Sequence, residues 1–414
     1  MESSNKFLFK LKIAQVMAIK AICFIFFVFL IVPILYLYEL ILQKKIKIVV
    51  LGSYRFSVLA LGLDYFLARR EEVGVDYHCF FITGKPVNVQ LLRMFKRELK
   101  VYEIDWLYKV FFLHTPVFKK TRFFEEFYHS LGFELFWTRK VRIRFSDSEE
   151  NLGQVWLREK GITEKDWFVC IFARDSGFLE KVYPNSMLYG KHVKNDWSYY
   201  NWRDSDIDDF IEAAKYIVER GGYVIRVGYG VKKPFNFKHE KVIDYSLSDR
   251  TDFLDIYLPA KCRFLVGTPG GNSELVQIFD KPRVVVNNIP IGQVPWGKND
   301  LYIGKKVVDK KTGEYISLSK AVSEDFAKVS DFNNYDEHNH LDALGLKYEN
   351  NSPNDILKVC QNMMDKLDGT EELPAKYHKI IDQYYDAFPD ESFFKNMRVP
   401  LGKDFLLDNE KLFV

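Results

Sequence analysis

The stretch Cys262-Arg-Phe-Leu-Val-Gly-Thr-Pro-Gly-Gly-Asn-Ser-Glu-Leu-Val-Gln-Ile-Phe279 predicts a buried strand, a glycine-rich turn and the start of a helix. The turn carries little side-chain bulk, so its amides can approach a phosphate at the N-terminus of the following helix. Strand-to-helix turns also use glycine with an Asn or Ser N-cap for geometry alone. The stretch itself leaves both interpretations open.

Short apolar runs alternate with helical patterns on both sides of this stretch. Strands are predicted at residues 167–173, 222–227, 241–245, 262–267 and 283–287, and helices at 206–219, 251–258 and 272–279. This alternation is typical of a parallel sheet with helices on its faces. Ligands of such sheets bind at the carboxyl ends of the strands, so we expect a binding site there.

The residues N-terminal to this region show the same alternation of strands and helices. Strands are predicted at 46–52 and 77–83, and helices at 57–70 and 87–99. The following stretch, 106–144, is rich in aromatic and basic residues that suit a core, a bilayer contact or a hydrophobic groove. The fold class predicted for the chain is therefore α/β, with two Rossmann-like domains behind an N-terminal membrane helix.

The N-terminus carries an uncharged apolar run at residues 21–38, long enough to cross a bilayer. No small-residue cleavage site follows it, which favours an uncleaved anchor over a signal peptide. Pro33 would allow a kinked, interfacial arrangement as the alternative to a simple span, which we favour slightly. Orientation stays open because lysines flank both ends of the run: Lys6, Lys10, Lys12 and Lys20 before it, and Lys44, Lys45 and Lys47 after it.

Length and composition narrow the class of protein. A chain of 414 residues suggests two domains, and its formal net charge of +3 comes with interspersed acids and bases. Since no basic stripe is present, we expect no nucleic-acid partner. The five cysteines are scattered and odd in number, which predicts reduced core thiols of a cytoplasm-facing protein rather than disulfides or a zinc site.

Several motifs of the second domain carry a resemblance to a known family. They are Phe168-Val-Cys-Ile-Phe-Ala-Arg-Asp-Ser176, Arg203-Asp-Ser-Asp-Ile207, Arg220-Gly-Gly-Tyr-Val-Ile-Arg-Val-Gly228, Val242-Ile-Asp-Tyr245, Phe264-Leu-Val-Gly-Thr-Pro-Gly-Gly271 and Glu349-Asn-Asn-Ser-Pro353. In order and spacing they resemble a family of bacterial glycosyltransferases over residues 147–364. The resemblance is weaker over the N-terminal domain and does not extend to the membrane run.

This resemblance implies a GT-B fold, in which two Rossmann-like domains enclose a cleft, and a nucleotide-sugar donor. The domains expected on this basis are a membrane anchor at 1–45, an acceptor-side α/β domain at 46–150, a donor-binding Rossmann-like domain at 151–305, and loops and helices packing across the domains at 306–414. The resemblance also implies a role in surface polysaccharide or glycan assembly.

Two positions depart from the family pattern. Asp204 stands where the family has Asn, and Ser57 and Val58 stand where it more often has Gly and a polar residue. If an acceptor-side base normally occupies the second of these places, Val58 cannot act as one. We then expect Asp64 or another carboxylate to take that role.

Sugar transfer from a nucleotide diphosphate needs positive charge at the departing phosphates and a base for the attacking hydroxyl. We expect the catalytic residues to be Arg174, Asp175 and Asp64. Arg174 ends a predicted strand and its guanidinium can fork onto phosphate oxygens. The alternative is a structural ion pair of Arg174 or Arg226 with one of the nearby aspartates.

Further residues at the predicted strand ends are expected to bind the donor. Asp244, Tyr245, Ser273 and Glu274 suit the hydroxyls of the ribose and the sugar, although Glu274 in a first helical turn also stabilises the helix dipole. The complete expected set is Arg203, Arg226, Gly228, Asp244, Tyr245, Thr268, Gly270, Gly271, Asn272, Ser273 and Glu274.

No metal ion or cofactor besides the donor substrate is expected. The triplet Asp204-Ser205-Asp206 resembles an acidic metal-binding motif. Ser205 followed by Asp208 is better interpreted as the capping box of a helix. His338 and His340 lie in a polar stretch that predicts a loop. Residues 305–312 are interpreted as a solvated basic turn.

These observations predict a glycosyltransferase of the bacterial inner membrane with a cytoplasmic catalytic domain. Its partners would be a nucleotide-sugar donor and a lipid-linked or cell-envelope glycan acceptor. Two alternatives remain open at this stage. One is a nucleotide-sugar epimerase built on the same fold, and the other is a glycan-binding protein without catalytic activity.

Overall fold

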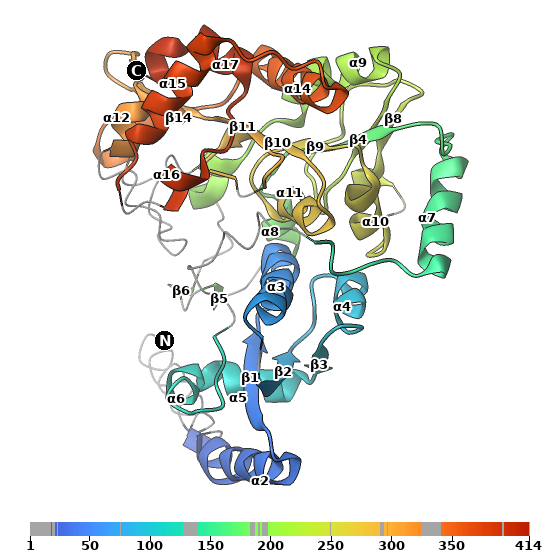
Figure 1. Ribbon diagram of the computed structural model, residues 1–414, viewed down its shortest axis with the longest axis vertical. Helices are drawn as coiled ribbons and strands as arrows, with labels where there is room; N and C mark the ends of the chain where they lie inside the picture. The colour runs from blue at the N-terminus through green and yellow to red at the C-terminus, as the bar shows by residue number, and fades with distance from the viewer. Residues whose placement is uncertain are drawn as a thin grey trace, which may run out of the picture. The chain divides into compact units, whose positions relative to one another are not determined.

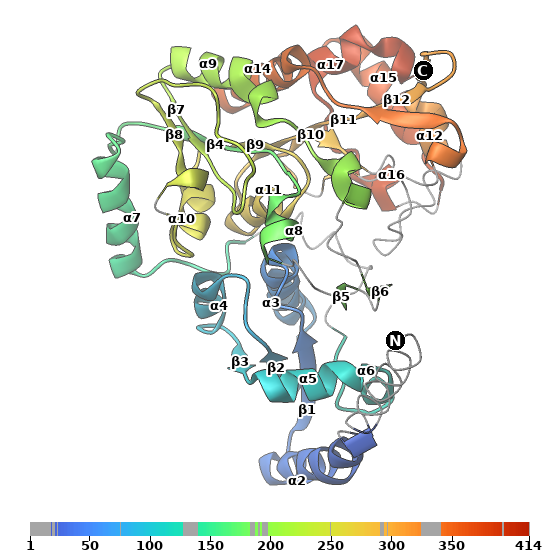
Figure 2. The same ribbon diagram turned by 180° about the vertical axis from the view of Figure 1, so that it is seen from behind.

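The chain forms two compact units, Met1–Leu135 and Phe136–Val414, in a computed structural model (Figures 1 and 2). The sequence placed this boundary at 150/151, which lies inside helix α7 (Asp147–Glu159) of the second unit. The lysines at positions 6, 10, 12 and 20, Cys23, and the histidines at 338 and 340 lie outside the described residues. Those described are 18, 21–22, 24–74, 76–126, 140–182, 187–188, 191–192, 198–248, 250–289, 294–295, 297–323, 341–390 and 393–413.

The first unit contains a parallel sheet in the order β1-β2-β3. Its strands are β1 (Lys45–Leu51), β2 (Tyr77–Thr83) and β3 (Lys100–Glu103). On the free edge of β1, Phe124 forms a further parallel bridge with Ile48. The apolar β-branched and aromatic residues of β1 and β2 suit strands whose faces are covered by helices.

Helices follow each strand of this unit. A π-helical turn (Val58–Gly62) leads into α3 (Leu63–Val73), and α4 (Val89–Phe95) begins where the Asn88 side chain accepts a hydrogen bond from the Leu91 amide at 2.8 Å. After β3 come α5 (Asp105–Leu113) and α6 (Thr115–Phe118). This α/β alternation was predicted, except for β3, α5 and α6.

The predicted apolar run forms a helix over Phe24–Leu42, the only described helix that is long and apolar enough to cross a membrane. It consists of helical residues, a π-turn (Phe27–Ile31) and α2 (Val32–Leu42). Pro33 has no amide hydrogen to donate, and the π-turn directly precedes it, so the helix continues through the proline.

The second unit contains a parallel sheet in the order β8-β7-β4-β9-β10-β11. Its strands are β4 (Phe168–Phe172), β7 (Tyr223–Arg226), β8 (Val242–Asp244), β9 (Leu265–Gly267), β10 (Arg283–Asn288) and β11 (Leu301–Gly304). Numbered along the chain, this order reads 3-2-1-4-5-6, the doubly wound order in which a crevice opens between the first and fourth strands. The mixed α/β class with parallel sheets is confirmed, and β11 is an additional strand.

Helices cover both faces of this sheet, with α9 and α14 (Pro353–Asp368) on one face and α10 and α11 on the other (Figures 1 and 2). A 3-10 turn (Ile207–Phe210) leads into α9 (Ile211–Glu219), and α11 (Gly271–Leu275) continues into a 3-10 turn (Val276–Phe279). The remaining elements of this part are α8 (Gly177–Val182), α10 (Leu254–Lys261), 3-10 turns at Ser198–Arg203 and Tyr245–Leu247, and the short pair β5 (Met187–Leu188) and β6 (Lys191–His192).

The C-terminal region adds a small antiparallel sheet in the order β13-β12-β14 and a group of helices. Helix α14 begins with a capping box between Ser352 and Asp355 and packs on α9, β10 and β11. The other elements are β12 (Lys306–Asp309), β13 (Tyr315–Ile316), β14 (Leu346–Glu349), α12 (Leu318–Ser323), α14 (Pro353–Asp368), α15 (Ala375–Asp386), α16 (Phe393–Met397), α17 (Lys403–Asp408) and a final 3-10 turn (Glu410–Leu412).

Candidate active site

The ends of β4 and β9 meet at the point where the strand order reverses. The Arg174 amide donates a hydrogen bond to Thr268 Oγ1 at 2.9 Å, and the Thr268 amide donates to the Phe172 carbonyl at 3.1 Å. On its other side, the Arg174 carbonyl accepts a hydrogen bond from the Ser205 amide at 3.0 Å. The backbone of Arg174 is therefore held from two directions at the edge where doubly wound sheets bind ligands.

The Arg174 guanidinium forms an ion pair with Asp204, one of the structural pairs that the sequence left open. Both side chains are largely buried, with 12% and 22% of their surface exposed. Burial raises the pKa of Asp204 to about 6, against the lowering effect of Arg174, and the negative charge of Asp175 raises it further. Asp204 therefore changes its charge at mildly acidic pH.

Lys305 lies buried beside this pair and Lys306–Asp309 form strand β12, so the interpretation of residues 305–312 as a solvated turn was wrong over 305–309. The Lys305 ammonium group donates to the Trp202 carbonyl at 2.6 Å and to the Asp204 carbonyl at 3.4 Å. Burial lowers the pKa of Lys305 to about 8, opposed by Asp204, and the charges of Arg174 and Arg203 lower it further. The positive charges of Arg174, Lys232 and Lys305 thus act on the one carboxylate of Asp204, which suits the binding of an additional anion.

A cleft of about 290 Å³ opens at this edge of the sheet, within the second unit. Its walls come from the ends of β4 and β7, the segment before α9 and the segment after β14. The lining residues are Ala173, Asp175, Asp204, Ser205, Asp206, Ile207, Arg226, Lys232, Lys233 and Asn350.

Asp175 fixes a neighbouring loop. One carboxylate oxygen accepts a hydrogen bond from the Gly177 amide at 2.9 Å, and the other accepts one from the Lys232 amide at 3.0 Å. Gly228, at the start of this loop, has a φ of 143°, which favours glycine. The contacts of Asp175 place Lys232 at the cleft and are those of a positioning residue.

Arg226 and Asp244 form the second ion pair that the sequence left open. Arg226 Nη1 donates to Asp244 Oδ2 at 3.1 Å and to the Lys233 carbonyl at 2.6 Å, and its side chain is 2% exposed. Asp244 also accepts a hydrogen bond from the Phe235 amide at 2.8 Å. Because these bonds join the ends of β7 and β8 to the segment between the two strands, the pair fixes the wall of the cleft.

Tyr245 lies in the core, so the expectation that it binds ribose needs correction. Its hydroxyl lies 3.1 Å from both the Thr251 carbonyl and Asp255 Oδ1, which share its one hydrogen, and it accepts a hydrogen bond from the Thr251 amide at 2.9 Å. Its ring packs edge-on against Trp156. The side chain has no exposed surface. The 3-10 turn that begins at this residue directs it inward.

The glycine-rich turn leads from Thr268 to the start of α11. Gly270, Gly271, Asn272 and Glu274 are half-buried, and the N-cap residue Gly270 makes no side-chain cap. Within the described part of the chain, no hydrogen bond satisfies the buried Ser273 hydroxyl. The N-terminus of α11 thus has no capping side chain at its N-cap position.

The acidic triplet caps a helix, as interpreted from the sequence, but through a different residue. The Asp206 side chain accepts a hydrogen bond from the Asp208 amide at 2.8 Å. Ser205 instead accepts one from the Asn287 side chain at 2.8 Å. The described residues contain no group of His, Cys, Asp or Glu that could hold a metal ion.

Two asparagines join the end of β10 to the segment before α14. The Asn287 and Asn351 amides each donate to the side-chain oxygen of the other residue at 2.6 Å. Asn287 has a φ of 52°, a conformation that Asn tolerates better than most residues. This pair places the neighbouring Asn350 at the cleft and gives a structural role to the motif Glu349-Asn-Asn-Ser-Pro353.

Asp64, the expected base, lies in the first turn of α3 in the first unit. Its side chain is buried, with 2% of the residue exposed. A substrate hydroxyl at the protein surface therefore does not reach this carboxylate in the present structure, and its expected role is not supported by its position.

Neither a family model nor a curated protein matches this sequence. Among solved structures, a glycosyl transferase family 9 protein from Veillonella parvula DSM 2008 aligns with a TM-score of 0.42 and 10% identity, covering 78% of this chain and 98% of that chain. The E. coli heptosyltransferase WaaC with ADP-2-deoxy-2-fluoro heptose aligns with a TM-score of 0.27 and 14% identity, covering 63% and 92%. Structural similarity at this level does not indicate which reaction this chain performs.

Proposed function

We propose that this protein is a glycosyltransferase whose nucleotide-sugar donor binds at the carboxyl edge of the second unit's sheet. The observation that supports this most strongly is the junction of Arg174 and Thr268 at the crevice between β4 and β9. The resemblance of the sequence motifs to bacterial glycosyltransferases supports the reaction type, since these motifs supply the residues of this junction.

The donor diphosphate would lie between the Arg174 guanidinium and the amides of the glycine-rich turn. A guanidinium has five N–H donors, so it can hold Asp204 and a phosphate oxygen at the same time. The buried charge of Lys305 would add to the positive potential. Fixed cations of this kind stabilise the charge that develops on the leaving diphosphate, so the proposed reaction is independent of a metal ion.

The cleft beside Arg174 would hold the sugar or the ribose. Asp206 and Asn350 line it with carboxylate and amide groups that hydrogen-bond hydroxyls. Asp244 and Arg226 would support these groups as a fixed pair. We assign no base to the acceptor hydroxyl, because the position of Asp64 argues against it.

The proposed acceptor is a lipid-linked or cell-envelope glycan, and the proposed location is the cytoplasmic face of the bacterial inner membrane. The apolar helix Phe24–Leu42 supports membrane association by its length and composition. A lipid-linked acceptor is confined to the bilayer surface, so an enzyme attached to the same surface meets it at a high local concentration.

Thermal shift of the purified full-length protein against a panel of nucleotide sugars tests donor binding. One donor should raise the unfolding temperature of the wild-type protein, and Arg174→Ala should abolish the rise. Arg398→Ala is the matched control, because Arg398 forms exposed ion pairs in the C-terminal region. A panel in which no nucleotide or nucleotide sugar shifts the wild-type protein contradicts the proposal.

Product analysis with the stabilising donor tests the reaction itself. Release of a nucleoside diphosphate together with growth of a glycan is the expected result. Release of an altered but intact nucleotide sugar would instead identify an epimerase. Glycan binding without consumption of any donor would identify a binding protein.

A further inference from the structure

One face of the apolar N-terminal helix is bound by the core of the first unit. Phe27 has no exposed surface, and its ring meets Phe111 and Phe118 edge-on with centroid distances of 5.3 and 5.6 Å. Partly buried Val28, Ile31, Val32, Leu35 and Leu42 join the same cluster. The contacts therefore extend from the first turns of the helix to its last residue.

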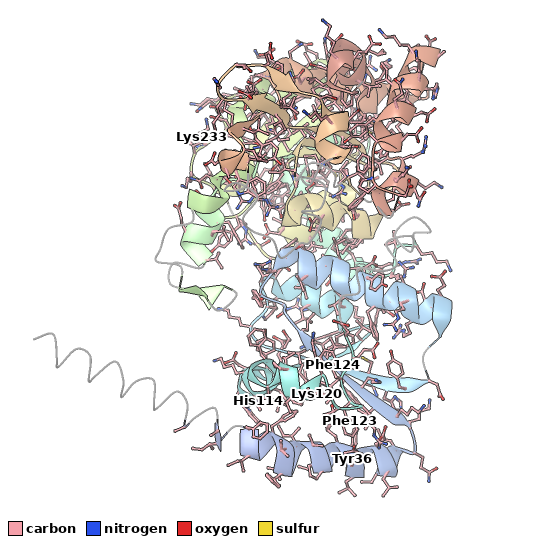
Figure 3. All side chains as sticks on the ribbon, turned by 90° about the vertical axis from the view of Figure 1, so that its left-hand side faces the viewer. Tyr36, His114, Lys120, Phe123, Phe124 and Lys233 are labelled. Carbon is pink, nitrogen blue, oxygen red and sulfur yellow. The ribbon has the colours of Figure 1, made fainter. Side chains whose placement is uncertain are left out.

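The C-terminal half of the helix is held by aromatic and polar contacts as well (Figure 3). Tyr36 packs edge-on against Phe123 at 4.7 Å, with the Arg122 guanidinium 4.4 Å from the Tyr36 ring. Glu39 accepts a hydrogen bond from the Ile46 amide at 3.1 Å and pairs with Arg122. The one charged residue of this helix thus faces the protein.

The opposite face of the helix is apolar and uncovered. Residues spaced three or four positions apart, and five apart across the π-turn, share one side of this helix and are each more than half exposed. They are Ile22, Ile25, Phe29, Ile34, Leu37 and Ile41. We call this surface the outer face. An uncovered apolar surface of this length marks a binding site for another apolar body.

Exposed lysines lie at the C-terminal end of the helix and on the segment that packs against its covered face. Lys44 and Lys45 follow the helix directly, and Lys119 and Lys120 follow α6, which packs against Phe27. Trp106 contacts Phe26 with a centroid distance of 6.3 Å and is itself exposed. Lysines and a tryptophan around an apolar face match the boundary between the headgroups and acyl chains of an anionic bilayer.

We propose that the protein docks on anionic phospholipid membranes by laying the helix Phe24–Leu42 in the plane of one leaflet. The outer face enters the acyl region, and the four lysines contact the headgroups. A helix crossing the bilayer would be surrounded by lipid, which requires breaking the contacts of Phe27 and Glu39 or drawing the first unit's core into the membrane. This inference rests on the membrane association in the proposed function and replaces the simple span favoured from the sequence.

Vesicle binding of the full-length protein, diluted out of detergent, tests the lipid partner. Vesicles of phosphatidylcholine mixed with phosphatidylglycerol should bind more protein than vesicles of phosphatidylcholine alone. The Ile41→Asp variant should bind about tenfold more weakly to both. A Lys119→Gln, Lys120→Gln double variant should lose the preference for the anionic vesicles. Leu152→Asp, at an exposed position in α7 of the second unit, is the matched control and should bind as the wild-type protein does.

A depth measurement separates the in-plane arrangement from a span. With a fluorophore at Ile25, Leu37 or Ile41, lipid-borne quenchers should report one shallow depth for all three positions. A profile that deepens toward the middle of the helix, with its two ends at opposite surfaces, would overturn the proposal. Equal binding of Ile41→Asp and wild-type protein to vesicles would do so too. The thermal shift that the donor induces should be the same in Ile41→Asp as in the wild-type protein. The membrane-docking proposal can therefore fail without the glycosyltransferase proposal failing.

Discussion

The hydrogen bond from the Arg174 amide to Thr268 Oγ1, at 2.9 Å, joins the two strands between which the sheet order reverses. Thr268 has no exposed surface, so its hydroxyl forms hydrogen bonds within the protein and does not face solvent. The bond couples the arginine proposed to hold phosphate to the first residue of the glycine-rich turn. Any change that separates them should affect stability and donor binding together.

Replacing Thr268 by valine keeps the side-chain volume but removes the acceptor of this bond. The partly buried Arg174 amide then lacks that partner, which should lower the free energy of unfolding by about 1 to 3 kcal/mol. Donor affinity should fall as well, because Arg174 loses its fixed position. Thr268→Ser keeps the hydroxyl and should retain donor affinity. Urea unfolding and titration calorimetry measure both effects, and unchanged donor affinity in Thr268→Val would contradict the coupling.

Asp204→Asn tests whether Arg174 is shared between the protein and the donor. The substitution removes a carboxylate that burial disfavours, since its pKa is raised to about 6. The positive charge of Arg174 is then no longer balanced by Asp204, so donor affinity should rise several-fold near pH 7. It also restores the residue that the resembling family has at this position. Weaker donor binding by Asp204→Asn, measured by calorimetry, would show that Asp204 itself contacts the donor.

The pH dependence of donor binding should reflect the ionisation of the Lys305 ammonium group. Its pKa of about 8 in the folded protein lies below the ordinary value of 10.5, so the folded state holds fewer protons than the unfolded state between these values. The free energy of unfolding therefore rises with pH between about 8 and 10.5. Below pH 8 the lysine is charged in both states, so the cost of burying its charge lowers the stability by its full amount. A bound diphosphate favours the charged lysine, so binding should take up a proton near pH 8 and weaken above it.

Calorimetry in two buffers with different ionisation enthalpies measures this proton uptake. Lys305→Met should abolish the uptake near pH 8 and weaken donor binding at pH 7. Lys311→Met alters an exposed lysine of the following turn and should leave both quantities unchanged. Proton uptake that persists in Lys305→Met would assign it to another group.

The sequence predicted the sheet and the junction because strand ends in a parallel sheet share an edge. Arg174 and Thr268 each follow a continuous apolar run, and this pattern is strong for buried strands. The burial of Lys305 was not predicted, since lysine is rarely buried and here precedes a second lysine. Its position depends on β11, a four-residue strand whose pattern is too short to distinguish from a loop.

Tyr245 shows a second limit of sequence patterns. It follows Asp244 at the end of β8, where a side chain can face either the ligand edge or the core. The 3-10 turn that begins at Tyr245 decides the direction, and no proline or glycine within it signals the turn. The ion pairs of Arg174 and Arg226 likewise depend on contacts between loops, which residue spacing does not specify.

The Asn287 and Asn351 pair should be important for stability. Asn351→Ala removes the acceptor of the Asn287 amide and the donor to the Gly304 carbonyl, which is made at 2.8 Å. The loss of one buried and one partly buried hydrogen bond should lower the free energy of unfolding by about 2 to 4 kcal/mol. Asn350→Ala changes the exposed neighbour and should have little effect on stability. Chemical denaturation of both variants checks this difference, and equal stabilities would contradict it.

Gly267 should tolerate no side chain, because it lies between β4 and β10 at the junction. A Cβ atom there would lie 2.5 Å from the Phe172 carbonyl oxygen, and this backbone is paired in the sheet and cannot move aside. Gly267→Ala should therefore lower the free energy of unfolding by about 3 kcal/mol. Gly304→Ala, at the end of β11, is the matched control, since the atom nearest to its added Cβ is the Asn288 carbonyl oxygen at 3.7 Å. If thermal unfolding shows both variants to be equally stable, the close approach of β9 to β4 at this residue is wrong. The proposed crevice would then lose the geometry that brings Thr268 to Arg174.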